Sequence, residues 1–131
     1  MKFKAEEIKK MKDGILTHNH PNGSCFSSYD INMARRAKLA EIRVAIGEGS
    51  YVFRPNGSSW PKEISSRKAI EAKMAEMEDF VSSRCRDIAA REGLSGRQSL
   101  QLLDREGMAA FCQHYGFEFS WEDKRESEFF K

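Results

Sequence analysis

A periodic stripe of apolar residues in the second half of the chain sets the strongest limit on the fold. Its members recur every three or four residues, the spacing that places side chains on one face of an α-helix: Ile70, Met74, Met77, Val81, Cys85 and Ile88. The stripe predicts one long amphipathic helix from about residue 63 to about residue 91, ended by Gly93. Residues 95–98 resemble the start of a further helix, so we expect the second half to be mainly helical.

The first half shows the alternating pattern of β-strands. Residues 42–46 and 51–54 flank a glycine-rich turn, which predicts a β-hairpin. A short apolar run at 15–18 predicts another strand, and the pattern over 28–39 predicts a helix on one face of the sheet. The segment 117–122 also alternates and is a candidate for a last strand. We therefore expect an α+β fold with a small sheet.

The chain is expected to form a single domain. It has 131 residues, which is enough for one hydrophobic core and too few for two full-sized domains. Within that domain, residues 1–58 should form an α/β part and residues 62–131 a mainly helical part.

Charge and cysteine content exclude several classes of protein. Lys and Arg total 22 against 20 Asp and Glu, a formal net charge of +2, which is too balanced for a protein that coats nucleic acid. The three cysteines are widely spaced, with no C-x-x-C pair, which predicts reduced thiols in a cytoplasm. Charges interrupt the N-terminal stretch where a signal peptide would be apolar, and no run is long enough to span a membrane. We expect a cytoplasmic protein without membrane contact.

The residues that could carry chemistry are concentrated between positions 17 and 31. His18 and His20 lie two residues apart at the end of a predicted strand, so both rings project to the same side. Asp30, in the first turn of the next helix, could be a third ligand, because catalytic zinc takes three protein ligands and a water. The Ser27 hydroxyl could hold that water or donate to an oxyanion. A polar loop without metal is the alternative interpretation.

The pattern H-x-H-P-x-G followed by S-x-x-D-I, at residues 18–23 and 27–31, resembles the JAMM metalloproteases, also called JAB or MPN-plus, and most of all their RadC-like bacterial branch. The resemblance covers roughly the first 55 residues. The chain also resembles phage head-morphogenesis proteins, which contain similar modules, and this second resemblance covers a longer span that includes a Y-x-F strand and a Trp-Pro region. It implies a JAB-like sheet, Zn²⁺ bound by His18, His20 and Asp30, and Ser27 assisting the hydrolysis of an amide or isopeptide bond.

The chain departs from that family at its start. In the family a glutamate acts as general base from a strand well upstream of the histidines, with a helix in between. This chain opens at that helix, so we expect an N-terminally truncated domain without this glutamate. Glu6 and Glu7 are the only upstream acids that could substitute for it, and they lie on the predicted helix itself. Loss of a general base typically costs about 10²–10⁴-fold in rate, so we expect little peptidase turnover.

Two functions of different class follow from this pattern. One is a JAMM-like zinc-dependent peptidase or isopeptidase of phage or mobile-element origin, acting in the host cytoplasm. The other is a non-enzymatic phage protein that binds a host or virion protein, for example as an inhibitor of host defence. Both imply a protein partner or peptide substrate, and an exposed sheet edge together with the apolar stripe could also support a homodimer. The balanced charge does not favour nucleic acid as a partner.

Other conspicuous residues have competing interpretations, and in each case we favour the structural one. Cys25 is a metal ligand, a nucleophile or a partly buried thiol. Trp60 and Trp121 are base-stacking platforms or packing anchors. The basic residues near the hairpin form a phosphate-binding or a solvated surface: Arg35, Arg36, Lys38 and Arg43.

Overall fold

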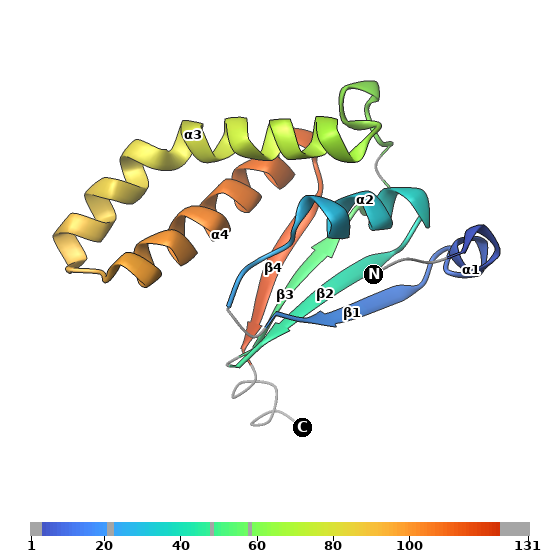
Figure 1. Ribbon diagram of the computed structural model, residues 1–131, viewed down its shortest axis with the longest axis horizontal. Coiled ribbons are helices and arrows are strands. Elements are labelled where there is room, and N and C mark those ends of the chain that lie inside the picture. Colours follow the sequence, from blue (N-terminus) through green and yellow to red (C-terminus); the bar gives the residue numbers. More distant parts are fainter. Residues whose placement is uncertain (1–3, 21–22, 48, 58, 124–131) are drawn as a thin grey trace.

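Four strands form one mixed sheet in the computed structural model, which describes residues 4–20, 23–47, 49–57 and 59–123 (Figure 1). The strands are β1 (Ile15–Asn19), β2 (Glu41–Ile46), β3 (Gly49–Arg54) and β4 (Glu118–Asp123), and they lie in this order across the sheet. β1 runs parallel to β2, whereas the β2–β3 and β3–β4 pairs are antiparallel. The predicted hairpin is the β2–β3 pair.

The segment 117–122 supplies the fourth strand of the sheet. On β4, Phe119 lies opposite Phe53, and Trp121 lies opposite Tyr51. The rings of Tyr51 and Trp121 are 4.9 Å apart between centroids, and those of Tyr51 and Phe119 are 5.7 Å apart. Aromatic cross-strand pairs stabilise an antiparallel sheet, so the alternation of this segment has a direct structural cause. The edges of the sheet are β1 and β4.

The helices complete an α+β fold whose second half is mainly helical. They are α1 (Ala5–Lys10), α2 (Ser28–Arg36), the 3₁₀ turn η1 (Lys62–Ile64), α3 (Arg67–Glu92) and α4 (Gly96–Tyr115). Figure 1 shows α2, α3 and α4 on the same side of the sheet, with the α3–α4 hairpin extending beyond it. Among the described residues, no helix combines the length and apolar character that a membrane span needs.

The long helix begins later than the sequence predicted. Residues 62–64 form a separate 3₁₀ turn, and the hydroxyl of Ser66 then accepts a hydrogen bond from the Ala69 backbone N–H at 3.2 Å. A serine that caps a helix in this way satisfies one of the free N–H groups of the first turn, so α3 starts at Arg67. Its end agrees with the prediction, because Gly93 adopts the left-handed conformation that terminates helices.

The apolar stripe of α3 is used inside the chain. Ile70 is fully buried in the main core, and Val81 and Cys85 form a second cluster with Leu102 of α4. The α3–α4 approach is close at Gly107, where an added Cβ would lie 2.6 Å from the Glu78 Cγ atom. Gly107 therefore permits this close contact because it has no side chain.

The main core lies between the sheet and the helices. Its largest fully buried side chains come from the strands, the helices and the loop before α2: Phe26, Phe53, Phe111, Ile31, Ile42, Ile64, Ile70, Val44 and Cys112. Trp60 packs between Phe53 and Phe117, with ring centroids 6.1 and 4.7 Å away. Trp121 packs on Tyr51. Both tryptophans are therefore packing residues, as we favoured.

Candidate metal centre

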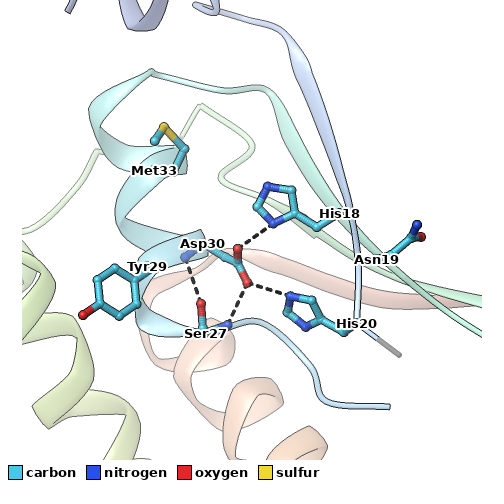
Figure 2. Close-up of a pocket in the computed structure, with 7 residues that line it drawn as sticks. All are labelled: His18, Asn19, His20, Ser27, Tyr29, Asp30 and Met33. Carbon is cyan, nitrogen blue, oxygen red and sulfur yellow. Dashed lines mark hydrogen bonds and ion pairs between the residues drawn. The ribbon is translucent and has the colours of Figure 1, made fainter. Parts of the chain in front are cut away.

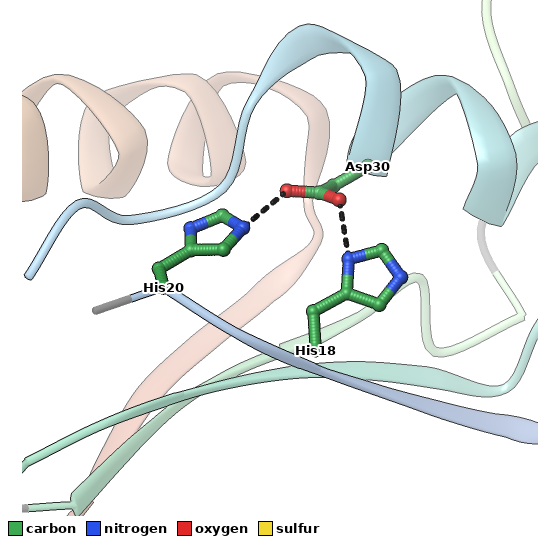
Figure 3. A group of neighbouring side chains, drawn as sticks. All are labelled: His18, His20 and Asp30. Atoms are coloured by element: carbon green, nitrogen blue, oxygen red, sulfur yellow. Dashed lines mark ion pairs between the residues drawn. The ribbon is translucent and has the colours of Figure 1, made fainter. Parts of the chain in front are cut away.

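His18 and His20 project from the end of β1 toward the start of α2, where Asp30 occupies the first helical turn (Figure 2). The Nδ1 atom of His18 lies 2.8 Å from the Asp30 Oδ1 atom, and the Nε2 atom of His20 lies 3.5 Å from the Oδ2 atom. Each of the three residues offers one ligand atom, and these atoms lie within 4.8 Å of one another (Figure 3). A group of two imidazoles and one carboxylate at this spacing could hold a metal ion.

The position of Asp30 follows from the way α2 begins. The Ser27 hydroxyl accepts from the Asp30 backbone N–H at 3.2 Å, and the Asp30 carboxylate accepts from the Ser27 backbone N–H at 2.9 Å. This reciprocal capping box stops the carboxylate from rotating away from the histidines. Asp30 is buried, with a side chain that is 6% exposed. The pattern S-x-x-D is therefore the capping motif that also presents a ligand.

The backbone of the loop that follows β1 holds His20. Its Nδ1 atom lies 2.9 Å from the Cys25 carbonyl oxygen and 3.1 Å from the Ser24 carbonyl oxygen. Because carbonyl oxygens only accept, we assign the proton of the neutral ring to Nδ1. The lone pair then lies on Nε2, the atom that faces Asp30. A second ring nitrogen bonded in this way is the usual means of orienting a metal-ligating histidine.

One ring nitrogen of His18 has no hydrogen-bond partner among the described residues. Its Nε2 atom is buried, and no hydrogen bond reaches it from the described part of the chain. Buried ring nitrogens are normally satisfied, because an unpaired polar atom costs free energy. Since Nδ1 is the ring nitrogen that faces Asp30, Nε2 lies on the side of the ring away from the cluster (Figure 3), where an ordered water could satisfy it.

The cluster lines a pocket of about 400 Å³ that opens between β1 and α2. Its lining residues are His18, Asn19, His20, Ser27, Tyr29, Asp30 and Met33. Asp30 is the only carboxylate among the lining residues that the structure describes. Glu6 and Glu7 lie exposed on α1 and do not belong to that lining. Among the residues described, no second acid lines this pocket.

Comparison with known proteins found no similar one. No family model, curated protein or solved structure matched the chain. The resemblance to JAMM enzymes therefore rests on sequence patterns alone, and the geometry of His18, His20 and Asp30 carries the functional argument.

The sequence did not point to Asp104, which supports the cluster from α4. One of its carboxylate oxygens accepts from the Cys25 backbone N–H at 2.6 Å. That N–H belongs to the same peptide unit as the Ser24 carbonyl that faces His20. Burial raises the pKa of Asp104, against the opposing effects of the Cys25 N–H and of His20. The separation of 79 residues left no local pattern by which this contact could have been found.

Cys25 acts through its backbone, because its side chain is buried among apolar residues. Burial raises the pKa of this thiol far above its ordinary value, which suppresses the thiolate. Within the described residues, the group that could hold a metal contains neither Cys25 nor His114. The structure thus favours the buried-thiol interpretation over a ligand or a nucleophile.

Two of the basic residues near the hairpin have partners within the chain. Arg43 pairs with Glu41 and Glu122, and Arg35 donates to the Asn32 side chain. These partners support the interpretation of a solvated, internally paired surface over a phosphate-binding one.

Proposed function

We propose that this chain is a zinc-dependent hydrolase module of JAMM type that cleaves a peptide or isopeptide bond. The observation that carries the proposal is the convergence of two imidazoles and one buried carboxylate in an open pocket. Three protein ligands with room for a fourth group are the mark of catalytic zinc sites, whereas structural sites are closed by four.

Zinc held at this site would act as a Lewis acid on a carbonyl oxygen and lower the pKa of a bound water. The protein's part is to keep the ligands in place. Ser27 and Asp30 fix each other through the capping box, and the carbonyls of residues 24 and 25 orient His20. The Ser27 hydroxyl accepts one hydrogen bond and still has its own proton to donate into the pocket that it lines.

A non-enzymatic metal-containing binding module is the second candidate. It is supported by the lining of the pocket, in which Asp30 is the sole carboxylate among the described residues and is itself a proposed ligand. A hydrolase would then need a general base from outside the described lining of this pocket. Phage origin and a host or virion protein as partner belong to this proposal as they do to the first.

Elemental analysis of the chain, purified without a metal-affinity tag, tests the proposal. We expect about one zinc per chain, and loss of that zinc in the double variant His18→Ala, His20→Ala. His114→Ala is the matched control, because His114 is exposed on α4 and outside the cluster. Equal zinc contents in the wild type and the double variant would overturn the site. Iron in place of zinc would also contradict the proposal, since two histidines and one carboxylate suit ferrous oxygenases too.

Hydrolysis of ubiquitin-like and peptide substrates by the zinc-loaded chain separates the two candidates. Zinc-dependent cleavage that Asp30→Asn abolishes would support the hydrolase. Zinc binding without any cleavage would favour the binding module.

A further inference from the structure

Within the described part of the chain, the edge strand β1 presents unpaired backbone groups beside the metal cluster. The His20 N–H donates to the Ala45 carbonyl at 3.0 Å, and the Gly14 carbonyl accepts from the Ala40 N–H at 3.0 Å. Because successive residues of a strand point their backbone groups to opposite sides, the even-numbered residues of this stretch face β2. The N–H and C=O groups of Ile15, Thr17 and Asn19 therefore face the free edge of the sheet.

The two edges of the sheet differ in how they are protected. Exposed edges are normally blunted by charged side chains or proline, which discourage another strand from pairing. β4 carries Glu118 and Glu122 at its edge. β1 carries only uncharged residues, with the sequence I-L-T-H-N, and Ile15 is 65% exposed. The edge beside the cluster is thus the one that can accept a further strand.

The pocket of the metal cluster opens over this same edge. Its lining includes Asn19 as well as His18 and His20, so it reaches residues from both faces of β1. Figure 2 shows His18 and His20 pointing from β1 toward Asp30, and Asn19 pointing away from them. A chain added to β1 would run about 4.8 Å from that strand and so would pass along the mouth of the pocket.

The opposite wall of the pocket mouth is an exposed aromatic side chain held in place. Tyr29 is 67% exposed, and the guanidinium of Arg67 on α3 lies 4.6 Å from the centre of its ring. Arg67 is in turn paired with Glu71 at 2.9 Å. A solvent-exposed ring at this position could contact a side chain of an added strand.

We infer that the free edge of β1 binds an extended polypeptide segment as an additional β-strand, which places its backbone at the metal cluster. The inference deepens the proposed function and rests on it for the role of the segment as substrate. It specifies the substrate class as a flexible tail or unfolded segment. Backbone pairing with Thr17 and Asn19 supplies the affinity, and contact with Tyr29 and Met33 supplies the side-chain preference.

Binding of random ten-residue peptides, selected from a displayed library against the zinc-loaded chain, tests this inference. We expect the selected peptides to bind Thr17→Pro at least tenfold more weakly than the wild type, because proline removes the N–H at the free edge. Thr17→Ala is the matched control, since it alters the same side chain and keeps the N–H, and it should bind as the wild type does. Equal binding by the proline variant, or no selected peptide, would overturn the inference.

Amide hydrogen exchange on the wild-type chain provides a test that needs no variant. In the free protein, the Thr17 and Asn19 amides should exchange fast and those of Leu16 and His18 slowly. A selected peptide should slow the exchange of Thr17 and Asn19. Protection of these two amides in the free protein would show an edge already paired, by a second copy or by this chain, and would contradict the inference.

The zinc measurement distinguishes this inference from the proposed function. A chain that binds zinc but leaves its edge amides unprotected by any selected peptide would overturn the edge site alone. A chain that takes up no zinc but still binds peptide at the β1 edge would support the edge site and overturn the proposed hydrolase.

Discussion

At the residue scale, Asp104 shows how a distant side chain can set the quality of a metal ligand. Its carboxylate binds the N–H of the peptide unit whose carbonyl faces His20. Hydrogen bonds in such a chain polarise one another, so the negative charge on Asp104 makes the Ser24 carbonyl a better acceptor. The His20 ring is thereby held with Nε2 toward Asp30. Asp104 is a positioning residue, since it does not itself belong to the ligand group.

We predict that Asp104→Asn lowers zinc affinity by about 10-fold and Asp104→Ala by up to about 100-fold, the range measured for partners behind ligating histidines. The asparagine can still accept from Cys25 but carries no charge, whereas alanine leaves that N–H unpaired. Competition with a chromophoric chelator measures both affinities. Glu106→Gln is the control, because Glu106 lies on the same helix and pairs with Arg84 instead. Unchanged affinity in both Asp104 variants would refute the role.

The stability of the metal-free Asp104→Asn variant separates positioning from folding. Burial raises the pKa of Asp104, and its charge in turn raises the pKa of Glu78, whose own burial is the larger cause. A raised folded-state pKa means that folding favours the protonated form of the carboxyl group over the ionised form. The stability that the protonated group contributes is present at low pH and is lost as pH rises through the folded-state pKa. We therefore expect the variant to be at least as stable as the wild type at pH 7. Lower zinc affinity without lower stability would identify a residue kept for function.

At the scale of elements, the first turn of α2 positions Asp30 for the metal cluster. Ser27 was predicted to assist a water, and the structure shows its hydroxyl as the N-cap of this helix. The two roles are compatible, because an accepting hydroxyl retains its proton as a donor. They differ in what a substitution should do to stability and to zinc.

We predict that Ser27→Ala destabilises the protein by about 1 kcal/mol, the usual cost of removing an N-cap, and that Ser27→Asn costs far less because asparagine also caps. Urea denaturation measures both. If Ser27 assists hydrolysis, the asparagine variant should keep its stability and zinc and lose turnover. Ser95→Ala, at the capping box of α4, gives the stability change expected from a cap alone. A stable Ser27→Ala variant would contradict the capping role.

The elements differ in how far the sequence alone could define them. The H-x-H and S-x-x-D patterns act locally, through strand alternation and helix capping, so the grouping of His18, His20 and Asp30 was predictable. The start of α3 was not, because the apolar stripe begins only at Ile70 and leaves the cap at Ser66 unmarked. Asp104 could not be found either, since its contact with Cys25 depends on how α4 packs.

At the scale of the whole molecule, the sheet joins the two halves of the chain. β4 comes from the helical half and pairs with β3 of the first half. On the sheet face away from the helices, ion pairs link three strands. Glu41 of β2 is nearly buried between Arg43 and Arg54, and these two arginines reach Glu122 and Glu118 of β4.

This arrangement makes the stability of the whole fold depend on the ionisation of Glu41. Burial alone would raise the pKa of Glu41, but hydrogen bonds from Arg43 and Arg54 outweigh it and lower the pKa below its ordinary value. A lowered folded-state pKa means that the contribution is complete above the unfolded pKa of about 4.3 and is lost as pH falls through the folded value. Glu41 should therefore stabilise the fold at neutral pH and contribute nothing in strong acid.

We predict that Glu41→Gln lowers the stability at pH 7, because it leaves two arginines without their shared carboxylate, and that its difference from the wild type shrinks as the pH falls below about 4.3. Urea denaturation at a series of pH values measures this difference. Glu71→Gln is the control, because its pair with Arg67 is exposed and should contribute little at any pH. A difference that stays constant across the acid range would show that Glu41 acts by packing alone. If the far-UV circular dichroism of the helices and the tryptophan fluorescence of the variant are lost at the same urea concentration, the sheet and the α3–α4 hairpin unfold as one unit.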